Sequence, residues 1–222
     1  MEERIKYLWD FLSIELFSLP GEHGSKPLFN PYFGLEPGLD QAQADRIRRE
    51  NLRSYFDSFL QLPRTLVVGE APGWKGCRFS GIPFTSEFQL LSGELPFSGE
   101  LSNKSGKPQR EASATIFWRV MRPFYPHFMA WNCLPLHPYK AGQPAANRHA
   151  STREIARFDQ ILRTFIKVLG PAGILAVGKD AQMSLARLSF DYTPVRHPSH
   201  GGVRTFEAGV EEFFRKMGIH PS

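Results

Sequence analysis

Four short apolar runs, separated by stretches with helical periodicity, constrain the fold of this chain more than any other feature. The runs are TLVVG (65–69), HFMAWN (127–132), GILAVG (173–178) and YTPVRHP (192–198). Helical patterns cover about 111–122, 152–169, 179–189 and 204–217. Strands that alternate with helices form βαβ crossovers. The sequence therefore predicts an α/β fold, with three α/β/α layers and a central four-stranded parallel sheet.

Two further helices are expected before the first strand. Residues 2–18 carry apolar side chains at a helical period, and the Pro- and Gly-containing segment SLPGEHGSKP ends that pattern. A second helix is predicted from about Asp40 to Leu60. A chain of 222 residues can bury one substantial core. We therefore expect a single domain over 1–222, with a helical extension at about 1–60.

Three arginines, Arg46, Arg49 and Arg53, fall on one side of the second predicted helix. We interpret them as a solvated face, with DNA contact as the alternative. The segment at 92–109 is polar and rich in glycine, and it predicts a long, potentially mobile surface loop.

Polar, Gly- and Pro-containing loops follow three of the four predicted strands. GEAPG follows the first strand, NCLPLHP the second and HPSHGG the fourth. Ligands of parallel sheets bind beyond the carboxyl ends of the strands. We therefore expect these three loops to converge at one edge of the sheet and to form the functional site there.

Charge and cysteine content narrow the functional class. The formal net charge of +5 favours an anionic partner, because Lys and Arg release counterions when they neutralise phosphates. The two cysteines, Cys77 and Cys133, have no CxxC spacing, which argues against a disulfide framework, a zinc site or a four-thiolate iron–sulfur cluster. We expect both to be reduced thiols.

The chain carries no pattern typical of membrane proteins or of targeting segments. The first residues mix acidic and basic side chains, unlike a signal or transit peptide. No apolar stretch approaches the roughly 20 residues that span a bilayer. We expect an intracellular protein without a membrane partner, located in the bacterial cytosol or nucleoid or elsewhere inside the cell.

An ordered set of motifs gives the most specific indication of function. The set comprises GEAPG (69–73), GIPFTSE (81–87), Asn132 at a strand end, NR (147–148) and RHPS (196–199). GEAPG alone is also compatible with a nucleotide-binding α/β enzyme, although the usual GxGxxG and GKS/GKT patterns are absent. Over roughly residues 64–215, the whole set resembles the uracil-DNA glycosylase superfamily, especially its fourth and fifth families.

The resemblance assigns a role to each motif. Gly69, Ala71, Pro72 and Gly73 form the turn that approaches the base, with glycines permitting close contact and proline stiffening the turn.

The base-binding side chains follow from the same resemblance. Phe84 matches the aromatic residue that stacks on the flipped uracil. Asn132 matches the residue that reads the pyrimidine edge through its amide, and His197 the donor to uracil O2. Without their flanking motifs, Phe84 would be interpreted as a core residue and Asn132 as the cap of a turn.

Two carboxylates are candidates for activating water. The first family has an Asp where this chain has Ala71. Glu70 occupies the acidic position of GEAPG in the fourth family, whereas Glu87 falls where the fifth family has an acid after its PFTG. We favour Glu70, since Glu87 is equally compatible with an acid that stabilises the first turn of a helix.

DNA contacts are expected from the C-terminal motif. Arg196, Ser199, His200 and Arg204 are the candidates, with Ser199 either contacting a phosphate or fixing its loop. Superfamily members usually place a bulky apolar wedge after HPS. In this chain His200 or Arg204 would have to act as the wedge. The fourth and fifth families also carry a [4Fe–4S] cluster, and this chain resembles a branch without one.

These observations lead to one functional hypothesis and one alternative. We expect a monomeric, monofunctional base-excision repair enzyme that flips uracil or a related deaminated base from DNA and hydrolyses its N-glycosidic bond, leaving an abasic site. It would need no metal and no cofactor. The alternative is a damaged-DNA binding protein of the same fold with weak or no catalysis, motivated by Ala71 and the altered wedge. The preferred lesion and strandedness stay open.

Overall fold

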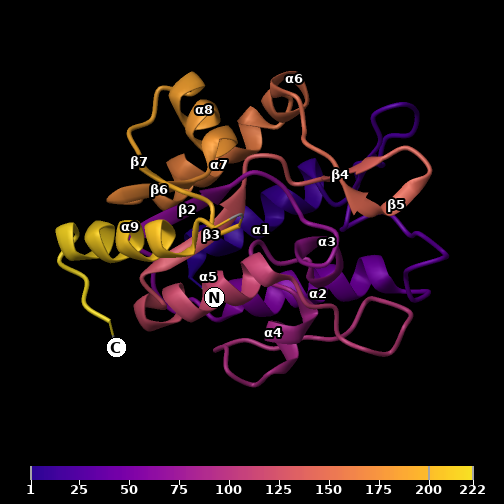
Figure 1. The fold of residues 1–222 in the computed structure, drawn as a ribbon, viewed down its shortest axis with the longest axis horizontal. Coiled ribbons are helices and arrows are strands. Elements are labelled where there is room, and N and C mark those ends of the chain that lie inside the picture. The colour runs from indigo at the N-terminus through magenta and orange to yellow at the C-terminus, as the bar shows by residue number, and fades with distance from the viewer. Residues whose placement is uncertain (1, 200, 222) are drawn as a thin grey trace.

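A parallel sheet of four strands forms the centre of the molecule. The computed structural model describes residues 2–199 and 201–221, and among them the sheet has the order β3-β2-β6-β7 (Figure 1). The strands are β2 (Thr65–Gly69), β3 (Phe128–Asn132), β6 (Gly173–Val177) and β7 (Thr193–Val195). All neighbouring pairs are parallel. The predicted α/β fold and its four strands are confirmed.

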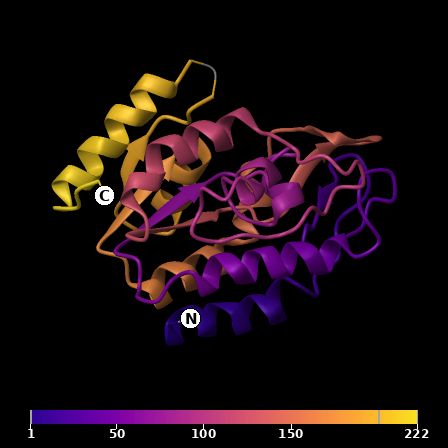
Figure 2. The same ribbon diagram turned by 90° about the horizontal axis from the view of Figure 1, so that it is seen from below.

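Helices cover both faces of this sheet. Along the chain they are α1 (Glu3–Glu15), α2 (Ala44–Asp57), α5 (Ala112–Met121), α7 (Asp159–Leu169), α8 (Lys179–Arg187) and α9 (Val203–Lys216). Helix α1 packs on α2 and α7, and α5 packs on α9 on the other side of the sheet (Figure 2). None of the described helices has the length and apolar character needed to cross a membrane.

The helix predicted over 152–169 is interrupted. It forms α6 (Thr152–Ala156) and α7, separated at Phe158, where the backbone leaves the helical region. The ring of Phe158 is buried, so the interruption places an aromatic side chain in the core. The reciprocal hydrogen bonds of Ser151 and Glu154 form the capping box at the start of α6.

A second, smaller sheet and several short helices were not predicted. The sheet is antiparallel with the order β1-β4-β5, built from β1 (Leu28–Phe29), β4 (His137–Lys140) and β5 (Gln143–Asn147). The short helices are α3 (Cys77–Ser80), α4 (Glu87–Leu91) and the 3₁₀ turn η1 (Arg122–Phe124). These elements are too short, and too rich in proline and polar residues, to produce a periodic pattern.

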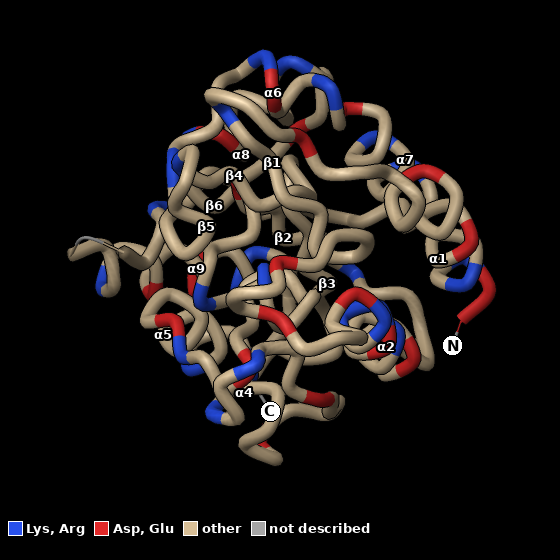
Figure 3. The backbone as a smooth tube through the Cα atoms, turned by 90° about the vertical axis from the view of Figure 1, so that its right-hand side faces the viewer, with Lys and Arg blue, Asp and Glu red and all other residues tan. Residues whose placement is uncertain are grey.

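The arginines on the outer side of α2 pair with acids of the same helix. Arg46 contacts Glu50 at 2.9 Å, and Arg53 contacts Asp57 at 3.1 Å. Arg49 is also paired, with Asp45. Basic and acidic residues accordingly lie side by side along α2 (Figure 3). These pairs agree with the interpretation of a solvated face.

One buried carboxylate connects the N-terminal segment to the rest of the molecule. The Asp40 carboxylate forms an ion pair with Arg48 at 2.8 Å and accepts hydrogen bonds from both terminal nitrogens of Arg78. All three side chains are at most 1% exposed. Burial lowers the pKa of Arg48 to about 10, although the charge of Asp40 opposes this shift. The carboxylate is therefore the counter-charge for two buried guanidinium groups.

Asp40→Asn should lower the free energy of unfolding by about 3–5 kcal/mol, because it leaves two buried cations without an anionic partner. Urea denaturation followed by circular dichroism measures the change. Asp57→Asn is the matched control, since it removes the exposed i,i+4 pair of α2, which is worth less than about 1 kcal/mol. Equal effects of the two substitutions would contradict this account of the Asp40 cluster.

Candidate active site

A cavity of about 260 Å³ lies at the carboxyl edge of the parallel sheet. The loops after β2, β3 and β7 all contribute to its wall, as expected from the strand-end rule. Eight predicted site residues line it: Glu70, Ala71, Pro72, Gly73, Phe84, Asn132, His197 and Ser199. Residues separated by more than 120 positions in the sequence therefore meet at one site.

Gly69 lies where two of these side chains come together. In the parallel register Gly69 is paired with Asn132, the last residue of β3. A Cβ atom at Gly69 would lie 2.8 Å from Asn132 Oδ1 and would overlap the ring of Phe84. The absence of a side chain at Gly69 therefore allows the phenyl ring and the amide to approach the same point.

Phe84 is held in a conformation that bulky residues rarely adopt. Its φ is 55°, in the left-handed region, which costs on the order of 1–3 kcal/mol unless the surroundings impose it. One side of its ring stacks on Phe117, with centroids 4.4 Å apart and planes inclined by 12°. The next residue, Thr85, is also fixed, because its hydroxyl accepts a hydrogen bond from Trp118 at 3.0 Å. Packing thus holds the Phe84 ring rigidly at the cavity wall.

The ring of His197 is oriented by Ser199. The backbone N–H of Ser199 donates to His197 Nδ1 at 3.2 Å, and the Ser199 hydroxyl lies 2.8 Å from the same atom. A backbone N–H only donates, so Nδ1 acts as the acceptor and the neutral ring carries its proton on Nε2. Ser199 therefore selects the tautomer in which Nε2 of His197 is a donor.

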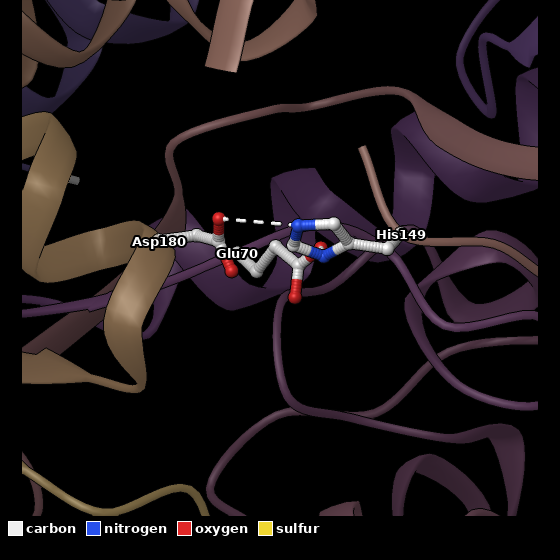
Figure 4. Close-up of side chains that lie close together, drawn as sticks. All are labelled: Glu70, His149 and Asp180. Atoms are coloured by element: carbon white, nitrogen blue, oxygen red, sulfur yellow. Dashed lines mark ion pairs between the residues drawn. The ribbon is translucent and has the colours of Figure 1, made fainter. Parts of the chain in front are cut away.

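Glu70 lines the cavity and lies next to the imidazole of His149. Its Oε1 lies 3.3 Å from His149 Nδ1, and His149 Nε2 lies 3.8 Å from Asp180 Oδ1 (Figure 4). Burial raises the pKa of Glu70, and the charge of Asp180 raises it further. His149 and a hydrogen bond from the backbone of Ala150 act in the opposite direction and lower it.

The same three side chains contain the atom types that bind metals. Their ligand atoms lie within 4.8 Å of one another. However, the two ring nitrogens of His149 face different carboxylates, and one metal ion would be bound through only one of them. An imidazole placed between two carboxylates fits this arrangement better than a single metal ion does.

A second carboxylate, Glu111, lies on another wall of the cavity. It precedes α5, and its oxygens lie so close to Gly73 and Gly76 that a Cβ at either glycine would overlap them. Burial raises the pKa of Glu111, and a hydrogen bond with Ser113 opposes that shift. Burial therefore makes this carboxyl group easier to protonate than one in water.

The loop after β5 is bound to the GEAPG turn. Asn147 Oδ1 accepts a hydrogen bond from the backbone of Trp74 at 2.9 Å. Arg148 contacts Glu154 and the backbone carbonyls of Tyr139 and Pro27. The NR pair of the motif set therefore fixes the loop that carries His149.

The structure does not bring Glu87 to the cavity. Its side chain is fully buried, and its carboxylate accepts hydrogen bonds from the backbone of Ser102 and Gln109 and from two nitrogens of Asn103. The water-activating role considered for Glu87 does not fit this position. The contacts also correct the expectation for the 92–109 loop, which is fixed at Ser102 and Asn103 because a buried carboxylate binds both.

Among the described residues, the expected DNA contacts are Arg196, Ser199 and Arg204. Arg196 and Arg204 are exposed, on the loop after β7 and in the first turn of α9. Ser199 lines the cavity itself and fixes His197. His200, one of two candidates for the wedge, lies outside the described residues.

Comparison with known proteins identifies the family. The model of the Uracil DNA glycosylase superfamily matches residues 57–217. The chain belongs to the uracil-DNA glycosylase superfamily. The crystal structure of wild-type SMUG2 from Pedobacter heparinus has a similar fold, with a TM-score of 0.69 over 97% of each chain and 15% sequence identity. No curated protein matches the chain.

The cysteines of this superfamily member do not fit an iron–sulfur cluster. Such a cluster is held by four thiolates, and this chain has two cysteines. Both are free and buried, as expected for reduced thiols. The Cys133 thiol donates to the backbone carbonyl of Glu70 at 3.2 Å.

Sequence reasoning missed three residues of this site, and two of them carried a signal. Asp180 follows β6, the one strand whose terminal loop was not considered. Glu111 directly precedes α5. This helix leads into β3, which begins at the amino edge of the parallel sheet, so the start of the helix lies at the carboxyl edge. Nothing in the sequence distinguished His149 apart from its place beside the NR pair.

Glu87→Gln should lower the free energy of unfolding by about 1–3 kcal/mol, because an amide NH₂ then faces backbone donors that a carboxylate oxygen accepted. Urea denaturation measures this, and limited proteolysis within 92–109 should become faster. Glu94→Gln is the control, because its side chain is 70% exposed. Unchanged stability and proteolysis in Glu87→Gln would show that this carboxylate does not hold the loop.

Proposed function

We propose that this protein is a monofunctional DNA glycosylase that excises uracil, or a closely related deaminated base, from DNA. The observation that carries the proposal is the meeting of Phe84, Asn132 and His197, from two loops and the end of β3, around one cavity. Glu70 lines the same cavity. Membership of the superfamily supports the same reaction class.

The flipped base would be held by stacking and by one amide. Phe117 covers one side of the Phe84 ring, so the other side is the surface on which a base stacks. Base–aromatic stacking is worth about 1–3 kcal/mol and does not depend on the identity of the base. Recognition therefore falls to Asn132, whose amide offers an acceptor to N3–H and a donor to O4 of uracil.

His197 would stabilise the departing base. As the bond between C1′ and N1 breaks, its electron pair moves onto the base and negative charge gathers on O2. The tautomer selected by Ser199 carries a proton on Nε2, which is the donor that this oxyanion needs. A donor fixed in advance is effective because no reorganisation is required when the charge develops.

Glu70 would activate the attacking water. Its carboxylate accepts a proton from water while the water oxygen bonds to C1′, and the products are a free base and an abasic site. A carboxylate at this position also stabilises the positive charge at the anomeric carbon. Because burial and Asp180 raise its pKa, we expect excision to decline as the pH falls through the pKa of Glu70.

Ala71 favours a second candidate function. It lines the cavity, and it replaces the Asp that the first family of the superfamily uses to activate water. A protein that binds damaged DNA and turns it over weakly would have the same cavity without an effective base. The two candidates differ in turnover and not in binding.

The pure protein should release uracil from an oligonucleotide that contains a single deoxyuridine, detected by alkaline cleavage at the abasic site. Parallel substrates carry hypoxanthine, xanthine or a mismatched thymine, each in single and double strands. Glu70→Gln should lower the single-turnover rate by about 10²–10⁴-fold. His197→Ala should lower it by about 10²–10³-fold.

Glu87→Gln is the control carboxylate, and it should excise uracil at the wild-type rate at temperatures where it is folded. Binding of uracil-containing DNA without any release of base would favour the second candidate. Inertness towards every lesion, with no preference for damaged DNA, would refute both.

A further inference from the structure

The His149 side chain lies between two carboxylates that belong to different elements. Glu70 follows β2, Asp180 lies in the first turn of α8, and His149 lies on the loop after β5. Figure 4 shows the imidazole of His149 reaching towards both acids, and each ring nitrogen faces a different one. A ring that donates through both nitrogens carries a positive charge.

Glu70, His149 and Asp180 differ in how far their side chains are exposed to solvent. The Asp180 side chain is 11% exposed, that of Glu70 is 37% exposed and that of His149 is 70% exposed. Asp180 is therefore the most buried of the three side chains, and its carboxylate lies close to Glu70. Two neighbouring carboxylates disfavour each other's ionised form, and a cation between them relieves the repulsion.

We propose that His149 is a positioning residue for Glu70: bound to Glu70 and Asp180 at once, it holds the Glu70 carboxylate at the cavity and keeps it ionised while a base is excised. The inference rests on the proposed function. His149 would be a partner of the water-activating Glu70, and Asn147 and Arg148 anchor the loop on which His149 lies.

Other titratable groups also face Glu70. Cys133 lies at the end of β3, and its thiol donates to the backbone carbonyl of Glu70. His197 and Glu111 line the same cavity from the loop after β7 and from the start of α5. Among the charged side chains, Asp180 and His149 are those whose charges act on the pKa of Glu70, and they act in opposite directions.

The test is the dependence of the single-turnover excision rate on pH. His149→Ala removes the charge that lowers the pKa of Glu70, so the acid limb of the profile should move to higher pH. A partly exposed pair corresponds to a shift of about half to one pH unit, or a rate roughly three- to tenfold lower on that limb. Asp180→Asn removes the charge that raises this pKa, so its acid limb should move to lower pH.

A third variant separates charge from position. His149→Gln keeps an N–H donor for Glu70 but carries no charge. Its acid limb should shift in the same direction as in His149→Ala but by less, because the hydrogen bond to the ionised carboxylate is kept, and its rate on the high-pH plateau should exceed that of the Ala variant. His127→Ala, an exposed histidine before β3 at the other edge of the sheet, should keep the wild-type profile.

Three outcomes would overturn the inference. A wild-type pH profile in His149→Ala would show that His149 does not influence the Glu70 carboxylate. Shifts of the same sign in His149→Ala and Asp180→Asn would refute the electrostatic account. If a chelator abolished the excision activity of the wild-type protein and a divalent cation restored it, a bound metal ion, and not a charged His149, would be the partner of these carboxylates.

Glu70→Gln distinguishes this failure from failure of the proposed function. If that variant retains the full rate, Glu70 is not the base and the functional assignment fails. If it is inactive while His149→Ala is unaffected, only the role of His149 is lost. Because the His149 side chain is 70% exposed, its removal should leave the melting temperature of the protein unchanged.

Discussion

The candidate site depends on the absence of a side chain at Gly69. This residue ends the first strand of the parallel sheet and is paired with Asn132 at the end of the next strand. The ring of Phe84 packs directly over it, so any Cβ at Gly69 would displace the ring or the amide. Parallel pairing brings the strand ends together, and the glycine lets an aromatic face and an amide share one cavity. Without that close approach, the phenyl ring and the amide could not line the same cavity.

Buried polar contacts keep the surrounding loops in place. Asp40 joins Arg48 and Arg78, and Glu87 binds the backbone of the 92–109 loop, both in regions shielded from water. Each of these carboxylates connects segments that are distant in sequence. Burying such charges has a large desolvation cost, which the pairing of Asp40 with two guanidinium groups offsets.

Much of the fold followed from the sequence, because β2, β3 and β6 are short, largely apolar runs followed by polar or Gly-containing segments. The small antiparallel sheet did not, since β1 has two residues and β5 contains proline and polar side chains. Position relative to a motif was also a poor guide to contacts. Glu87 follows Phe84 by three residues, yet the chain turns at the left-handed Phe84 and buries Glu87 against another loop. His149 and Asp180 approach Glu70 only through tertiary packing, which no local pattern reports.

The central claim is that loops from separate strands close around one extrahelical base, and a crystal structure of Glu70→Gln bound to uracil-containing DNA tests it most directly. The account predicts that the uracil ring lies on the Phe84 face opposite Phe117, with its N3–O4 edge at the Asn132 amide and O2 within hydrogen-bond distance of His197 Nε2. A uracil that stays in the DNA stack, or that binds away from these three side chains, would contradict it.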